Sequence, residues 1–288
     1  MEKANELQSQ VREIEGLSTI PLSMTRIMLV ADDPKATAND LAQEIASDQS
    51  LTAKILQIVN SAFYGFRREI SSVTDAVVIL GFNQVRHMAT AVSVFGAFQR
   101  GEDRLFDRQL LWRHSLACAM TSNALTIKSR DKYPDEKGGH TAGLLHDIGK
   151  VVLDQYFHDK LVEVMVYAKD RSAPLIEAEQ TILGATHADV GGWLADSWGF
   201  PVTLVESIKC HHAPHEAHEP RLLPFVTHAS NAVCNALGYA ATDTVEHGTD
   251  VDEEARQAAG ITRDSIRNIQ EQLEKNAAFL EGISSAMS

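Results

Sequence analysis

The sequence has few cysteines and no long apolar run, and both shortages exclude classes of protein. Cys118, Cys210 and Cys234 are an odd number without CxxC spacing, which argues against a disulfide framework and predicts reduced thiols that fill small spaces in the core. No stretch of about 18 apolar residues occurs, and the polar segment Met1 to Gly16 has no apolar core, so neither a membrane span nor a signal peptide is expected. The sequence therefore predicts a soluble cytoplasmic protein.

Positive charge is also scarce, which disfavours nucleic-acid binding. The chain has 26 Lys and Arg against 39 Asp and Glu, a net charge of -13, and no basic run. Contacts to phosphate need a surplus of Lys and Arg on some face, so a protein that wraps a duplex is not expected. With 288 residues, 44% of them apolar and 23% charged, the chain lies in the ordinary globular range and can form one large domain or two.

Sustained alternation of polar and apolar residues, the pattern typical of strands, is absent from the sequence. Apolar residues recur at helical spacing almost throughout, which predicts an all-α, multi-helix fold. Thr37 and Ser50 are expected to be helix N-caps, and Ser72 with Asp75 to open a helix that stops at Gly81.

Longer helical patterns follow in the second half of the chain. One helix is predicted from Asp107 to Ser129, with His114 on its inward face, another begins after Thr186, and a third covers Pro224 to Gly238. The acidic, turn-like stretch Thr242 to Asp252 is the expected domain boundary. Beyond it, apolar residues follow a 3-4 spacing through Ile266, Ile269, Leu273, Asn276, Leu280 and Ile283. This stripe is expected to pack on its own domain or on a partner chain, as a homodimer.

A histidine and an aspartate stand side by side, His146 and Asp147, in the apolar helical stretch Leu144 to Lys150. Burial of two adjacent ionisable groups needs a partner, and a divalent cation is the strongest one available. Imidazole and carboxylate ligands suit Zn, Mn or Fe, and such ions turn water into a nucleophile near neutral pH in hydrolytic sites. The histidines that a folded chain could bring to this pair are His114, His187, His211 and His212. A purely structural role stays open, because a lone histidine on an apolar stripe is more often a hydrogen-bonded core residue.

These residues, in this order and with these neighbours, resemble the HD superfamily of metal-dependent phosphohydrolases. The resemblance rests on Trp112–Ser115, His146–Lys150, Thr186–Gly191 and the His211-His212 doublet. It implies that His114, His146 and Asp147 bind one divalent ion and that His187, His211 and His212 serve a second, with Fe, Mn or Zn as the metal. It also implies a catalytic role for Asp147, with Lys150 facing the phosphate of a small-molecule substrate.

A second set of segments in the N-terminal half is similar to the HDOD domain. The matching segments are 17–21, 45–48, 51–56, 59–65, 70–73, 76–77 and 79–81. HDOD domains are helical HD relatives found as bacterial signal-transduction output modules, often behind the receiver domain of a response regulator. The resemblance implies an HDOD domain over 17–241, with an N-terminal helical part at 17–105 and an HD-like part at 106–241. A linker helix is expected over 1–16, and an acidic turn with a C-terminal helix over 242–288.

Two departures from the HD pattern bear on chemistry. Where the pattern ends in an aspartate that closes the first metal site, this chain has Asn231, so cation affinity should fall unless His228, water or another carboxylate substitutes. The His211 to Pro214 segment does not continue into the Asp-Gly-x-Gly-Tyr-Pro run of the cyclic-di-GMP-cleaving branch, so that substrate is not expected. Many HDOD members have lost the His-Asp pair that this chain keeps, which favours retained metal binding.

Two functions from different classes fit the sequence. The first is a signalling module that recognises a protein partner, with any metal ion acting as a structural clamp, as the N-terminal resemblance and Asn231 suggest. The second is a metal-dependent phosphohydrolase for phosphodiesters or nucleotides, which uses a bridging hydroxide and requires tight metal binding. We prefer the first hypothesis and keep the second as the alternative.

Overall fold

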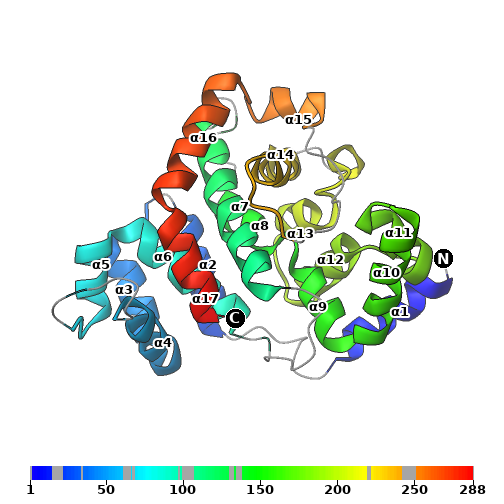
Figure 1. Cartoon of the computed structure of the whole chain (residues 1–288). Helices are drawn as coiled ribbons and strands as arrows, with labels where there is room; N and C mark the ends of the chain where they lie inside the picture. The colour runs from blue at the N-terminus through cyan, green and yellow to red at the C-terminus, as the bar shows by residue number, and fades with distance from the viewer. Residues whose placement is uncertain are drawn as a thin grey trace.

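Helices are the regular elements of the computed structural model, and no strand occurs within the residues that it describes (Figure 1). These residues are 2–14, 22–33, 35–60, 66, 69–96, 98, 107–129, 133, 138–218, 222–241 and 251–287. The all-α prediction is confirmed. The HDOD-like segments at 17–21 and 61–65 lie outside the described residues, as does the acidic turn at 242–250.

Five helices of the N-terminal half lie together at one end of the molecule (Figure 1). They are α2 (Leu22–Asp32), α3 (Ala38–Ala46), α4 (Gln49–Val59), α5 (Val73–Leu80) and α6 (Phe82–Phe95). Thr37 caps α3 and Ser72 caps α5, as predicted, because each side-chain oxygen accepts the backbone N–H three residues later. The prediction for Ser50 is wrong: Asp48 caps α4 by accepting from the Leu51 N–H.

The central helix is α7 (Arg108–Lys128), and it is covered on several sides. Its caps, Asp107 and Ser129, are the predicted ends of this helix. The helices with the most extensive contacts to it are α8 (Gly139–Leu145), α14 (Leu222–Ala236) and α17 (Ala277–Met287). His114, in the middle of α7, is therefore fully buried.

The His146-Asp147 pair lies at a break between α8 and α9 (Ile148–Tyr156), not inside one helix as the sequence suggested. Asp147 has φ −98° and ψ 9°, outside the helical range. Two glycines flank the break, and each lets its short helix approach a different neighbour closely. A Cβ on Gly143 would lie 2.4 Å from the Cys118 carbonyl oxygen on α7, and one on Gly149 would lie 1.9 Å from the His187 carbonyl oxygen.

The remaining helices surround α9 and α14. They are α10 (His158–Arg171), α11 (Leu175–Leu183), α12 (His187–Ser197), α13 (Val202–Lys209), the 3-10 turn η1 (Pro214–Glu216), α15 (Glu253–Ala258) and α16 (Arg263–Lys275). Thr186 caps α12 through the predicted capping box with Asp189. In the described part of the chain, no helix combines the length and apolar character needed to cross a bilayer.

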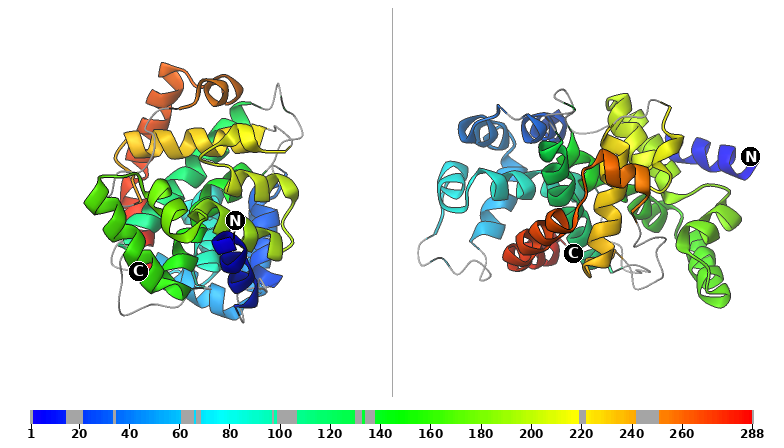
Figure 2. Two further views of the ribbon diagram at one scale, coloured as in Figure 1. Left: turned by 90° about the vertical axis from the view of Figure 1, so that its right-hand side faces the viewer. Right: turned by 90° about the horizontal axis from the view of Figure 1, so that it is seen from above.

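Both terminal helices pack on the rest of the chain. The N-terminal α1 (Glu2–Glu13), expected as a linker, buries Leu7 and Val11 and contacts α11 and α12. Figure 2 shows α1 at the opposite end of the molecule from α2 to α6. The predicted C-terminal stripe packs against α7, with Ile269, Leu273 and Ile283 buried.

Candidate metal centre

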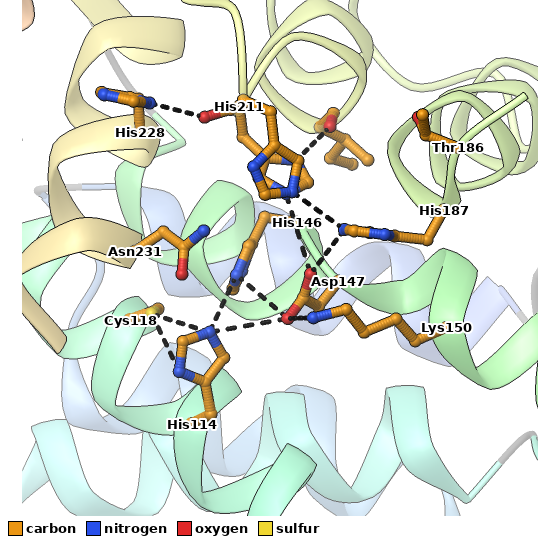
Figure 3. Close-up of polar contacts among 12 residues, drawn as sticks. His114, Cys118, His146, Asp147, Lys150, Thr186, His187, His211, His228 and Asn231 are labelled. Atoms are coloured by element: carbon orange, nitrogen blue, oxygen red, sulfur yellow. Dashed lines mark hydrogen bonds and ion pairs between the residues drawn. The ribbon is translucent and has the colours of Figure 1, made fainter. Parts of the chain in front are cut away.

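Six side chains predicted from the sequence converge at one place, between α7, the α8–α9 break, α12 and the segment after α13 (Figure 3). They are His114, His146, Asp147, His187, His211 and His212. All are buried except His212, which is partly exposed. The Nε2 atoms approach in pairs, at 3.1 Å between His114 and His146 and 3.0 Å between His187 and His212. Their role as metal ligands stays a prediction.

Asp147 stands between two sets of imidazoles, and each of its carboxylate oxygens faces one set. Oδ2 lies 3.5 Å from His114 Nε2 and 3.4 Å from His146 Nε2. Oδ1 lies 3.2 Å from His187 Nε2 and 3.7 Å from His211 Nε2. The HD resemblance implied two ligand sets, with Asp147 in the first, and in the structure Asp147 lies between the two sets of imidazoles.

Four of the histidines direct Nε2 into the centre, because Nδ1 of each ring donates a hydrogen bond to an oxygen atom outside it. Nδ1 of His146 donates to the Gly143 carbonyl at 2.8 Å and Nδ1 of His211 to the Ile208 carbonyl at 2.7 Å. Nδ1 of His114 donates to the Tyr239 carbonyl, and Nδ1 of His187 donates to Glu179. In a neutral imidazole, a proton fixed on Nδ1 leaves the Nε2 lone pair free to bind a metal ion, and a hydrogen-bonded Nδ1 is the usual arrangement of histidine ligands.

Three imidazoles of the cluster, those of His146, His211 and His212, are neutral, and they surround a charged carboxylate. Burial lowers the pKa of His146 to about 4. Burial and the neighbouring imidazoles hold the pKa values of His211 and His212 well below 6.5. Burial alone would raise the pKa of Asp147, but His146, Lys150 and His187 outweigh it and keep that pKa well below 3.8. The carboxylate is therefore ionised.

His187 differs from its neighbours because a buried carboxylate holds its outer nitrogen. Glu179 Oε2, on α11, lies 2.7 Å from Nδ1 of His187 and also accepts its backbone N–H at 2.9 Å. Burial would lower the pKa of His187, but Glu179, assisted by Asp147, raises it to about 9. A metal ion at His187 must therefore displace a proton from Nε2.

Glu179→Gln is expected to flatten the pH dependence of stability of the metal-free protein. The pKa of His187 is raised above its unfolded value of 6.5, so its charged form contributes stability that is fully present below about pH 6.5 and is lost as the pH rises through about 9. The wild-type free energy of unfolding should fall by about 3 kcal/mol over this range, measured by urea unfolding in chelator. Equal pH slopes in the two proteins would contradict the assignment.

The residues at this site fit a divalent ion. Two buried polar atoms here, Asp147 Oδ1 and His211 Nε2, have no assigned hydrogen bond within the described residues, although Oδ1 lies 3.2 Å from His187 Nε2. An unsatisfied buried polar atom is costly, and a cation would satisfy both of these. When bound, such an ion would supply Lewis acidity and lower the pKa of a bound water.

Lys150 lies inside the centre, although a lysine after a helix-ending glycine is more often solvated. Its side chain is 1% exposed and its Nζ donates to Asp147 Oδ2 at 2.9 Å. The sequence predicted a phosphate contact for this lysine. The structure places the ammonium on the carboxylate instead, and a phosphate contact stays a prediction.

Asn231 lies beside His146 in Figure 3, and nothing observed at His228 replaces the missing carboxylate. His228 Nδ1 donates to the His211 carbonyl at 2.8 Å, and its Nε2 accepts the Asp252 N–H at 3.2 Å. Both ring nitrogens are therefore engaged away from the centre. The first of the expected substitutes, His228, is not placed to bind an ion.

Sequence reasoning missed three contributors to the centre. Glu179 orients His187, the Tyr239 carbonyl orients His114, and the Cys118 sulfur lies 3.5 Å from His114 Nε2. A carbonyl leaves no signal in a sequence. Cys118 had one, because it follows His114 by four residues on the same helix and therefore shares its face.

Comparison with known proteins identifies the family. The family model described as HDOD domain matches residues 17–214. The chain belongs to the HDOD family. A Treponema pallidum (strain Nichols) protein, itself uncharacterized, is 23% identical over 207 residues, which are 72% of the HDOD chain and 40% of that relative. The HDOD chain thus matches less than half of that relative's length.

Solved structures share the fold of this HDOD protein. An HDOD domain protein of unknown function from Geobacter sulfurreducens is 22% identical with a TM-score of 0.71, covering 100% of this chain and 97% of that one. A candidate phosphohydrolase from Shewanella amazonensis SB2B is 22% identical with a TM-score of 0.69, covering 99% of each chain. A candidate signal-transduction protein from Marinobacter aquaeolei VT8 is 21% identical with a TM-score of 0.77, and the match covers 99% of this chain and 65% of that one. At these identities the likeness shows the fold alone.

Proposed function

We propose that this HDOD protein is a signal-transduction regulatory module in which a buried metal centre holds the helices of the HD-like half together. The observation that carries the proposal is the closure of the site. His114, His146 and His211 are fully buried, and Asp147 and His187 are each 1% exposed. A catalytic metal site keeps a coordination position open to water and substrate, and the burial of five of the six side chains restricts such access here. An ion here would join α7, the α8–α9 break, α12 and the end of α13.

One residue favours a clamp over a hydrolytic site. Asn231 supplies no charge where the HD pattern has an aspartate. This change lowers the affinity for the two ions that a bridging hydroxide requires.

The output of such a module would be contact with a protein partner in the cytoplasm. Val78 and Ile79, adjacent on α5, expose 79% and 52% of their surfaces. Exposed apolar groups of this kind can pack against the surface of a partner protein. Self-association as a homodimer through the C-terminal helix is a further proposal, and it would use the outer face of this helix, since the stripe is buried against α7. The solution mass of the full chain, compared with a truncation after Gly248, would test it.

The alternative is a metal-dependent phosphohydrolase acting on a small phosphate compound. It is favoured by the position of Asp147 between both imidazole sets and by His212, the one partly exposed member of the set. A substrate phosphate would have to enter beside His212. His212 and Lys150 would then contact it.

Metal analysis combined with turnover assays separates the two functions. We expect purified protein supplemented with Zn, Mn or Fe to retain about one ion per chain and to gain stability, by mass action of a ligand that binds the folded state. We expect no metal-dependent hydrolysis of p-nitrophenyl phosphate, bis-p-nitrophenyl phosphate or nucleotides. Hydrolysis that requires metal and is lost in His146→Ala would overturn the clamp in favour of the enzyme. Fewer than one ion per chain would overturn both.

A further inference from the structure

Cys118 lies at the edge of the first ligand set, next to the position where the HD pattern has its closing aspartate. Its sulfur is 3.5 Å from His114 Nε2, and the metal-binding atoms of His114, Cys118 and His146 all lie within 4.8 Å of one another. The sulfur is also 3.9 Å from the carbonyl oxygen of Ser230, the residue before Asn231. Figure 3 shows the sulfur on the same side of His114 as Asn231.

We propose that Cys118 is a thiolate ligand that completes the first metal site with His114, His146 and Asp147, in place of the carboxylate that Asn231 lacks. The inference rests on the proposed metal centre and specifies its donor set. Since soft thiolate donors favour zinc over manganese, the site would prefer Zn. The buried, unsatisfied Asp147 Oδ1 and His211 Nε2 face the second imidazole set, and they are the independent sign that a cation belongs in the adjoining part of the cluster.

Four of the six distances between these donor atoms are close to those around a tetrahedral ion, and the Cys118 sulfur lies within 4.8 Å of the ligand atom of His146. Bonds of about 2.0–2.1 Å to nitrogen or oxygen and about 2.3 Å to sulfur, at tetrahedral angles, place donor atoms about 3.3–3.6 Å apart. His114 Nε2 lies 3.5 Å from the Cys118 sulfur, 3.5 Å from Asp147 Oδ2 and 3.1 Å from His146 Nε2. His146 Nε2 lies 3.4 Å from Asp147 Oδ2.

The charge balance of the site also favours a thiolate as its fourth donor. One carboxylate alone would leave a divalent ion with a net positive charge, beside the buried Lys150 ammonium that already contacts Asp147. A thiolate adds the second negative charge and makes the ion with its four donors neutral. On ligation the thiol loses its proton to solvent, and the weak S–H contact to the Ser230 carbonyl is lost with it.

X-ray absorption of the zinc-loaded full chain tests the inference without any mutation. We expect one sulfur neighbour at about 2.3 Å among nitrogen and oxygen neighbours at about 2.0–2.1 Å, and a thiolate-to-cobalt charge-transfer band after exchange for Co²⁺. Cys118→Ser should lose both signals and bind zinc about 10–100-fold more weakly. Cys234→Ser is the matched control, because Cys234 is buried on α14 and its sulfur lies 3.5 Å from Thr121 Oγ1. It should keep both signals.

A rescue variant separates ligation from packing. Cys118→Ser with Asn231→Asp should recover the zinc affinity without the sulfur signal and should increase the affinity for Mn²⁺, since a carboxylate replaces the thiolate. A stoichiometric zinc ion without a sulfur neighbour in the wild-type chain would overturn the role of Cys118 and leave the metal centre intact. Absence of bound metal would overturn the proposed centre itself.

Discussion

Asp147→Asn is expected to abolish metal binding and, in chelator, to lower the free energy of unfolding by about 3–5 kcal/mol. The carboxylate is the one group that faces both imidazole sets, at 3.5 Å from His114 Nε2 and 3.2 Å from His187 Nε2. It also holds the buried Lys150 ammonium at 2.9 Å. Removing one partner of a buried pair leaves the other charge uncompensated. Metal content by mass spectrometry and urea unfolding measure the two effects.

Asp147→Asn combined with Lys150→Met separates these effects. The double variant removes both charges, so we expect most of the lost stability to return while metal binding stays absent. If the single variant were as stable as wild type in chelator, Lys150 would not depend on Asp147. If it still bound an ion at wild-type affinity, Asp147 would not belong to the centre.

The features of the fold that were predicted from the sequence are local ones. The ends of α7 at Asp107 and Ser129 and the caps at Thr37 and Thr186 follow from side chains within one turn of each helix end. The break at the His-Asp pair was not predicted, since helical periodicity continues through it. It depends on where Gly143 and Gly149 meet backbone atoms far away in the sequence.

The candidate centre also combines features that the sequence predicts with features that depend on contacts between distant segments. Its six expected residues share an order along the chain that the HD resemblance made visible, and the structure brings them together. The groups that orient them could not be found this way: Glu179 reaches His187 only because of the turn between α11 and α12, and Tyr239 contributes a backbone oxygen. Cys118 was predicted as core filler because a buried thiol is usually inert, and only its distance from His114 gives it another role.

Gly149→Ala is expected to separate α9 from α12 and to lower the free energy of unfolding by about 3 kcal/mol. The added Cβ would lie 1.9 Å from the His187 carbonyl oxygen and 2.8 Å from the Gly191 nitrogen, and backbone atoms cannot rotate away. Gly191→Ala is the control at the same contact. Its Cβ would meet the Ile208 Cγ2 methyl at 3.0 Å, and the better helix propensity of alanine, about 1 kcal/mol, offsets a small adjustment.

The same displacement should reach the metal centre, because Gly149 is two residues from Asp147 and its steric partner is the backbone of His187. Moving α9 by the distance needed to relieve the overlap lengthens the 3.2 Å approach of Asp147 Oδ1 to His187 Nε2. We therefore expect Gly149→Ala to weaken metal binding as well as stability, and Gly191→Ala to change neither by more than about 1 kcal/mol. Isothermal titration with Zn²⁺ and urea unfolding of both variants check this. A Gly149→Ala chain with wild-type zinc affinity would show that α9 and α12 can part without disturbing the ligands.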